Sequence, residues 1–177
     1  MNLEIALPIL LPLLLGALSL LAHGRLQVQR WLGVTGTGAL LASALWLLHS
    51  VTQKGVVVLH MGDWHAPFGI TLAADLLGAS MAVLTGLLGF ATAIYSLATT
   101  PRGHERYGHW PLLHLLLAGV TGAFLTGDIF NLYVWFEVML VASFALLTLG
   151  GERAQMEGAI KYVALNLLSS MIFLSAL

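Results

Sequence analysis

The stretch Gly122-Ala-Phe-Leu-Thr-Gly-Asp128-Ile-Phe-Asn-Leu-Tyr-Val-Trp-Phe-Glu137-Val-Met-Leu140 holds the end of one apolar run and most of the next. Glu137 is the single charged residue in the apolar segment 132–149. A lone carboxylate at that depth in a bilayer is costly unless it is paired or functional. The joint around Gly127 and Asp128 is so short that the two runs must form antiparallel neighbours. The stretch therefore predicts two packed membrane helices with a functional acid in the second.

Composition extends this prediction to the whole chain. Of its 177 residues 59% are hydrophobic and 8% are charged, and the mean hydropathy is +0.92. So little polar surface cannot cover a soluble protein of this size. The apolar runs reach the roughly 20 residues that cross a bilayer as helices, and they lack the alternation of barrel strands. We therefore expect an all-α integral membrane protein.

Six transmembrane helices are predicted, at residues 3–22, 31–50, 73–99, 110–126, 129–149 and 157–177. Between the second and third, two β-branched runs flank a Gly, Asp and Pro turn, which predicts a short β-hairpin over 56–72. The domain prediction is an N-terminal three-helix segment, 1–106, followed by a second unit, 107–177. Because the first run carries Glu4 where a signal peptide would be basic, it is expected to stay in the membrane. The abrupt stop at Leu177 suggests a fragment.

Basic residues predict the orientation, since they are retained on the cytoplasmic side of short connections. All but one of the seven fall in or beside the odd-numbered connections: Arg25, Arg30, Arg102, Arg106, Arg153 and Lys161. Only Lys54 lies in an alternate one. We therefore expect the N-terminus, the hairpin and the Leu177 end to face outward.

Several classes are excluded or disfavoured by the same composition. The scattered basic residues form no patch for nucleic acid. The absence of cysteine excludes disulfides, thiolate metal sites and thiol nucleophiles in these residues. The pairs His60/His65 and His104/His109 have no third ligand at a zinc-like spacing. We predict no metal and no cofactor.

Glu137 is the predicted proton site, with Tyr133 one helical turn away and with Phe130, Val141 and Phe144 predicted on the same helix face. The alternative is a structural carboxylate that ties two helices together. Along the sixth span, Asn166, Ser169 and Ser170 share a face with Tyr162, and such groups hold files of water between spans or, more commonly, hydrogen-bond neighbouring helices.

Three further titratable residues are candidates for a proton path. Lys161 lies one turn inside the sixth span, where it either pairs with Glu137 or extends to the interface. His114 lies inside the fourth span and is either a relay or a packing histidine. Asp128, like Asp75, precedes a helix and is expected to cap it; the alternative for Asp128 is a point where protons enter or leave.

Residues 107–170 resemble the antiporter-like subunits shared by complex I and Mrp-type multisubunit Na+/H+ antiporters, and most of all the D subunit of the Mrp type. The resemblance rests on the run 122–143, on Leu149-Gly-Gly-Glu152 and on Ile160-Lys-Tyr-Val-Ala-Leu-Asn-Leu-Leu-Ser-Ser170. Gly62-Asp-Trp, Pro67-Phe-Gly-Ile70 and Ala74-Asp75 are similar to the outer hairpin and third helix of that protein. It implies an N-terminal fragment of a subunit with two inverted repeats, in which Glu137 pairs with a lysine on a later helix.

The function so implied is proton translocation in a multisubunit monovalent cation (Na+)/proton antiporter. The implied setting is a bacterial cell membrane, with other membrane subunits as partners. One rival is a pumping subunit of a complex I-like NADH:quinone oxidoreductase or membrane hydrogenase. The other is a structural membrane scaffold without transport chemistry.

Overall fold

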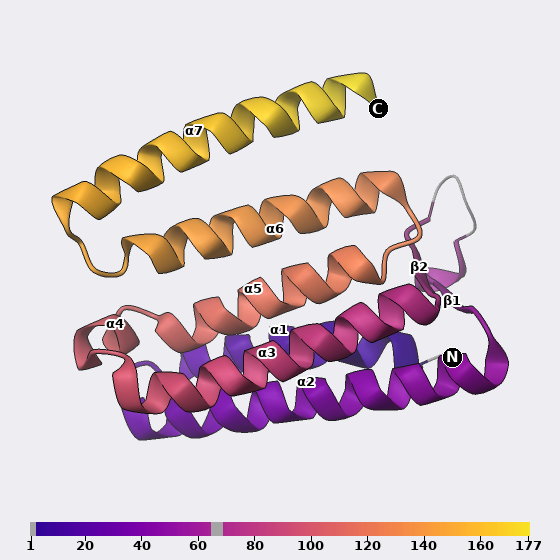
Figure 1. Cartoon of the computed structure of the whole chain (residues 1–177), viewed down its shortest axis with the longest axis horizontal. Helices are drawn as coiled ribbons and strands as arrows, with labels where there is room; N and C mark the ends of the chain where they lie inside the picture. Colours follow the sequence, from indigo (N-terminus) through magenta and orange to yellow (C-terminus); the bar gives the residue numbers. More distant parts are fainter. Residues whose placement is uncertain (1–2, 65–68) are drawn as a thin grey trace.

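Figure 1 shows the computed structural model, which describes residues 3–64 and 69–177. The elements in chain order are α1 (Leu3–Leu21), α2 (Leu26–Lys54), β1 (Val57–His60), a 3₁₀ turn (Met61–Asp63), β2 (Thr71–Ala74), α3 (Leu76–Thr99), α4 (Arg102–Arg106), α5 (His109–Phe124), α6 (Ile129–Thr148) and α7 (Arg153–Ala176).

The predicted all-α membrane fold with a small hairpin is confirmed. Within the described ranges, five helices, α1, α2, α3, α6 and α7, are long and apolar enough to cross a membrane. Helix α5 is also apolar but has 16 residues, about 24 Å of rise. The chain is therefore a multi-pass membrane protein.

Element boundaries differ from the sequence prediction in several places. Helix α2 begins at Leu26 rather than near residue 31, because Gln27, Gln29 and Arg30 lower the local hydropathy without breaking the helix. Helix α7 begins at Arg153 rather than near residue 157. Strand β2 starts at Thr71 and α3 starts only after Asp75, whose side chain accepts a hydrogen bond from the Gly78 amide, 2.7 Å away. The short α4 was not predicted, since five mostly polar residues show no apolar period.

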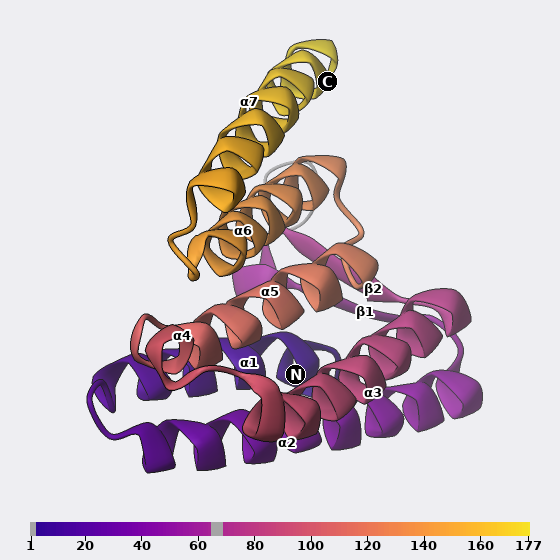
Figure 2. The same ribbon diagram turned by 60° about the vertical axis from the view of Figure 1, so that its left-hand side comes forward.

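The helices run up and down, so that connections alternate between two ends (Figure 1). Helix α2 packs against α1 and α3, and α5 packs against α1 and α3. Helix α6 packs on α5, whereas α7 packs mainly on α6 and stands away from the rest of the bundle (Figure 2). Helix α4 and the α6–α7 connection lie at the same end of the bundle, which carries Arg102, Arg106 and Arg153. That this end faces the cytoplasm stays a prediction.

The hairpin fixes where α6 begins. Strands β1 and β2 are antiparallel, with Val57 opposite Ala74 and His60 opposite Thr71. The free edge of β2 binds the α5–α6 connection: the Ala73 amide donates to the Leu125 carbonyl (2.9 Å) and the Gly127 amide donates to the Thr71 carbonyl (2.8 Å). Residues 65–68, which include His65 and part of the predicted turn, lie outside the described residues.

Two ion pairs join helices at opposite ends of the bundle. At the hairpin end, Lys54 Nζ lies 2.8 Å from Glu4 Oε1. At the α4 end, Arg30 binds both carboxylate oxygens of Glu105 at 2.8 Å, and Trp110 Nε1 donates to Glu105 Oε1 at 3.2 Å. The sequence alone did not predict either pair, because their partners are far apart in the chain.

The close contact between α2 and α3 depends on the absence of a side chain at Gly86. A methyl group there would lie 2.8 Å from the Cα of Leu41 in α2, and backbone cannot move aside as a flexible side chain can. We expect Gly86→Ala to destabilise the protein by about 1–3 kcal/mol, as overpacking does. The measurement is the thermal stability of the purified protein. Gly158→Ala is the matched control: that helical glycine has no atom within 4 Å of an added methyl, so stability should hold or rise slightly. Equal losses in both variants would contradict a specific α2–α3 contact.

Candidate functional site

Glu137 lies about 12 Å along α6 from its first residue, so its carboxylate is well inside the apolar span. The start of α6 is set by Asp128, whose side chain accepts hydrogen bonds from the amides of Phe130 (2.7 Å) and Asn131 (3.2 Å). Thr126 Oγ1 accepts a further hydrogen bond from the Asn131 side chain at 2.8 Å. Together with the hairpin contacts, this cap fixes the depth of Glu137.

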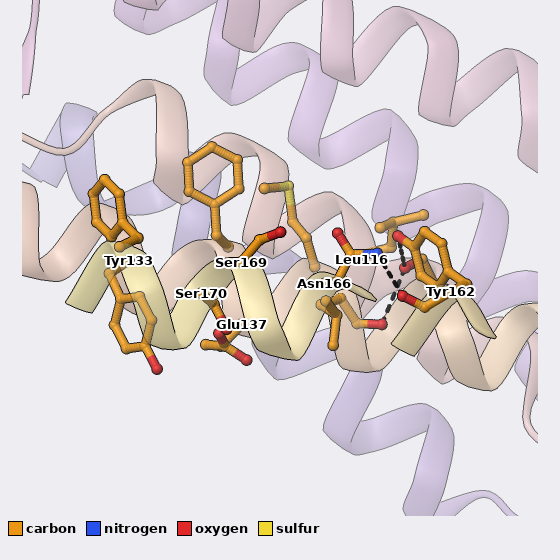
Figure 3. Close-up of a pocket in the computed structure, with 12 residues that line it drawn as sticks. Leu116, Tyr133, Glu137, Tyr162, Asn166, Ser169 and Ser170 are labelled. Atoms are coloured by element: carbon orange, nitrogen blue, oxygen red, sulfur yellow. Dashed lines mark hydrogen bonds between the residues drawn. The ribbon is translucent and has the colours of Figure 1, made fainter. Parts of the chain in front are cut away.

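Glu137 lines a cavity of about 570 Å³ between α6 and α7. Residues of α6, α7 and one residue of α5 form its walls: Leu116, Tyr133, Phe136, Glu137, Met139, Leu140, Ser143, Tyr162, Asn166, Ser169, Ser170 and Phe173. Figure 3 shows Tyr133 and Glu137 together with Asn166, Ser169 and Ser170 around this space. The residues singled out on the two helices thus share one cavity, which separate helical patterns could not establish.

The Glu137 carboxylate is half-buried and forms no hydrogen bond or ion pair with any residue in the described ranges. The cavity wall is mostly apolar or aromatic on α6 and mostly polar on α7. An intramembrane carboxylate without a partner in its own bundle is a functional-site candidate, because nothing else offsets its cost.

The polar residues of α7 satisfy their donors within their own helix. Asn166 donates to the Tyr162 carbonyl at 2.8 Å, Ser169 to that of Leu165 at 3.0 Å, and Ser170 to that of Leu167 at 3.2 Å. Their lone pairs remain on the cavity side, where they can accept from water. These hydrogen bonds stay within α7. Among the described residues, Asn166, Ser169 and Ser170 therefore form no hydrogen bond to a neighbouring helix.

Both ends of the cavity are bounded by tyrosine. Towards the hairpin end, the Tyr133 ring stacks on Phe173 with centroids 6.3 Å apart and planes 10° apart. Towards the other end, Tyr162 Oη and Ser143 Oγ form a hydrogen bond of 3.2 Å between α7 and α6. Ser143 was not among the predicted site residues. The sequence could have indicated Ser143, because it lies on one helix face with Phe136 and Leu140, at i, i+4 and i+7 spacing.

The face of α6 that meets the cavity differs from the predicted one. The sequence placed Phe130, Val141 and Phe144 with Glu137, but Phe130 is 52% and Val141 is 55% exposed, and none of the three lines the cavity. The true face is rotated, because α6 packs on α5 through Trp135: a methyl group at Gly122 would lie 2.3 Å from the Trp135 ring.

Lys161 and His114 lie outside the cavity. Lys161 Nζ pairs with Glu157 Oε1 at 2.8 Å, one turn earlier on α7, and its side chain is 71% exposed, so it does not pair with Glu137. His114 is fully buried on the opposite face of α5 from α6, where its Nδ1 donates to the Trp110 carbonyl at 2.9 Å. A methyl group at Gly36 of α2 would lie 2.3 Å from His114 Nε2, which places the imidazole against α2.

Asp128 caps α6, and its role can be separated from proton transfer. Asn caps as well as Asp but does not ionise. We expect Asp128→Asn to keep both stability and the proton translocation that the sequence predicts, and Asp128→Ala to lower stability by about 1 kcal/mol. The measurements are the melting of the protein and proton movement across the membrane. Loss of transport in the stable Asn variant would instead make Asp128 a point where protons enter or leave.

No group of three metal-ligating side chains occurs in the part of the chain that the structure describes. His109 Nε2 lies 3.2 Å from Ser96 Oγ, and His60 Nδ1 lies 3.1 Å from Thr71 Oγ1. These histidines are therefore engaged in local hydrogen bonds.

Comparison with known proteins finds similar sequences and similar solved structures, whereas no family model matches the chain. It is 40% identical to the D subunit of a Na(+)/H(+) antiporter from Alkalihalophilus pseudofirmus, across 98% of this chain and 35% of that protein. It is 39% identical to the D subunit of a probable K(+)/H(+) antiporter from Rhizobium meliloti, across 95% of this chain and 32% of that protein.

Solved structures show the same likeness. A chain in the Mrp complex from Dietzia matches with a TM-score of 0.87 at 32% identity, covering 98% of this chain and 33% of that one. A chain of the membrane-bound sulfane sulfur reductase, an archaeal respiratory membrane complex, matches with a TM-score of 0.86 at 28% identity, covering 97% and 35%.

Fold and comparisons together show a multi-pass membrane chain that is similar to antiporter-like membrane subunits. The chain is homologous along nearly its whole length to proteins named as the D subunits of Na+/H+ antiporters, and it spans about a third of the length of those relatives. The resemblance found in the sequence is confirmed.

Proposed function

We propose that this chain is part of a proton-translocating subunit of a multisubunit monovalent cation/proton antiporter, with Na+ as the cation and Glu137 as the intramembrane proton site. The observation that carries the proposal is the unpartnered Glu137 carboxylate on a cavity lined by Tyr133, Ser169 and Ser170. The names of the relatives and the fold of the Mrp neighbour support it.

Physically, Glu137 would take a proton from water in this cavity and release it when a neighbouring positive charge arrives. An opposite charge nearby favours the ionised carboxylate, and removal of that charge favours the protonated form. The resemblance supplies such a charge as a lysine on a later helix of the subunit. Protonation of Glu137 and movement of the next charge would then be coupled electrostatically.

The setting belongs to the same proposal. We assign the subunit to a bacterial cell membrane, beside other membrane subunits of one complex, with α4 on the cytoplasmic side and the N-terminus outside. Because these 177 residues contain no cysteine, a single Gly103→Cys in a complex freed of other cysteines tests the orientation. An impermeant maleimide should label it from the cytoplasmic side only. Labelling from the outside would show that the topology is the reverse of the one proposed.

A redox-driven pump is the second candidate, favoured by the likeness to the sulfane sulfur reductase complex. Glu137 would have the same role, but the energy would come from redox partners. The structural scaffold remains the third alternative, and variants of Glu137 test it.

One transport experiment separates the first two candidates. Everted vesicles containing the full-length subunit with all its partner subunits are energised by ATP hydrolysis alone, and the internal acidification is followed with a pH-sensitive dye. Addition of Na+ should then release protons from the vesicles, with K+ and Li+ tested in parallel. Vesicles that ignore every cation but acidify when supplied with an electron donor and acceptor would establish the redox pump instead.

A further inference from the structure

An apolar groove of about 360 Å³ runs between α1 and α5, outside the Glu137 cavity. Its walls are the α4-end halves of the two helices and the residues before α5: Pro12, Leu13, Gly16, Ala17, Leu20, Tyr107, Gly108, Pro111, Leu112 and Leu115. We infer that this α1–α5 groove binds one anionic phospholipid, with an acyl chain in the groove and its phosphate at the basic end of the bundle.

The depth of the groove follows from small and cyclic residues. At its floor, a methyl group on Gly16 would lie 3.2 Å from His114 Cβ and 3.5 Å from the Pro111 carbonyl oxygen, so the helices touch there. Ala17 and Leu20 are exposed along its rim. Apart from the Tyr107 hydroxyl, the side chains of the wall carry no polar atom, which suits a hydrocarbon chain and no polar ligand.

The mouth of the groove lies beside three exposed arginines. Arg106 directly precedes Tyr107, Arg102 lies on the same short α4, and Arg25 follows the end of α1; all three are exposed. Within the described ranges, none of these arginines takes part in an ion pair. The carboxylate beside them, Glu105, is buried and already paired with Arg30.

Phosphate of an anionic lipid matches this arrangement. Tyr107, 76% exposed at the groove mouth, is the kind of side chain that lies at headgroup level. Basic pockets between membrane helices hold anionic headgroups, and the attraction requires both the charge and the adjoining apolar surface. An apolar helix of a partner would fill the groove but would leave the three arginines without counter-charges. This inference depends on the proposed orientation at one point only: the orientation decides which leaflet of the bilayer supplies the lipid.

Photocrosslinking of lipid to the assembled full-length complex tests the proposal. The complex is placed in phosphatidylcholine nanodiscs that contain a trace of either phosphatidylglycerol or phosphatidylcholine with a diazirine in the acyl chain. After illumination, labelled peptides are mapped by mass spectrometry. We expect labelling of the α1 and α5 segments that line the groove, with the anionic probe preferred. Peptides of α3 around the exposed Leu88 should show no preference between the probes.

Two sets of variants separate chain binding from headgroup binding. Arg102→Gln and Arg106→Gln should each lower the preference for phosphatidylglycerol about fivefold while leaving phosphatidylcholine labelling unchanged. Ala17→Trp should fill the groove and lower labelling by both probes, whereas Leu18→Trp, on an exposed α1 residue outside the groove wall, should not.

Absence of groove labelling in the wild-type complex would show that another protein segment covers the groove, and it would overturn the proposal. Equal labelling by the two probes, unaffected by the arginine variants, would overturn it as well. None of these readouts depends on transport, so a failure here is distinguishable from a failure of the antiporter assignment.

Discussion

Replacement of Glu137 with alanine is expected to reduce cation-driven proton movement to background while leaving the complex assembled. The carboxylate has no partner among the described residues, so its removal breaks no ion pair within this part of the subunit and deletes a charge from an apolar span. A structural tie would behave in the opposite way, with loss of stability and assembly. The measurement is Na+-induced proton release from everted vesicles, with co-purification of the partner subunits in parallel.

Conservative variants sharpen the test. Glu137→Asp keeps an ionisable group one methylene shorter and should retain part of the activity, whereas Glu137→Gln keeps the shape but not the titration and should behave like alanine. Glu157→Ala is the matched control, because it removes an exposed carboxylate from the next helix that forms only a surface pair. Full transport in the assembled alanine variant would remove Glu137 from the mechanism and favour the scaffold alternative.

Loss of the Glu105 carboxylate should produce the largest change in stability. Glu105 is fully buried and binds Arg30 through two hydrogen bonds of 2.8 Å while accepting a third from Trp110. Removal of one member of a buried pair costs about 3–5 kcal/mol. Since the Arg30 side chain is 27% exposed and water can partly solvate it, we expect about 2–4 kcal/mol for Glu105→Ala. The measurement is the melting of the assembled complex in detergent.

The double variant shows whether the pair itself matters. Arg30→Met combined with Glu105→Met should recover much of the lost stability, because an apolar pair leaves no uncompensated charge. Glu152→Ala removes an exposed carboxylate at the same end of the bundle and should change little. A double variant as unstable as Glu105→Ala would contradict the ion-pair explanation.

The contribution of Glu105 should also depend on pH in one direction. Burial by itself would raise the pKa of the Glu105 carboxyl, but the hydrogen bonds from Arg30 and Trp110 and the charge of Arg30 outweigh it, so the pKa lies below its ordinary value. A carboxyl with a lowered pKa stabilises the fold fully above its unfolded pKa and loses that contribution as the pH falls through the lowered value. The stability gap between wild type and Glu105→Gln should therefore be constant near neutrality and shrink only in strong acid.

The site was only partly predictable from sequence. Tyr133, Glu137, Asn166, Ser169 and Ser170 were predicted from their residue types and spacing, and the structure brings all five to one cavity. Their roles in a proton path stay predictions. Lys161 and His114 were placed by depth alone, and depth does not say which way a side chain points around its helix.

The sequence by itself determined the class of protein, the helical spans, the hairpin and an acid within an apolar span. These follow from local properties: apolar length, turn residues and the high cost of a buried charge are all set within a few turns of chain. Only the tertiary structure decided the rotation of α6, the pairing of Arg30 with Glu105 and the groove between α1 and α5. These depend on contacts between distant segments, where glycines such as Gly86 and Gly122 set how closely helices approach and therefore which faces meet.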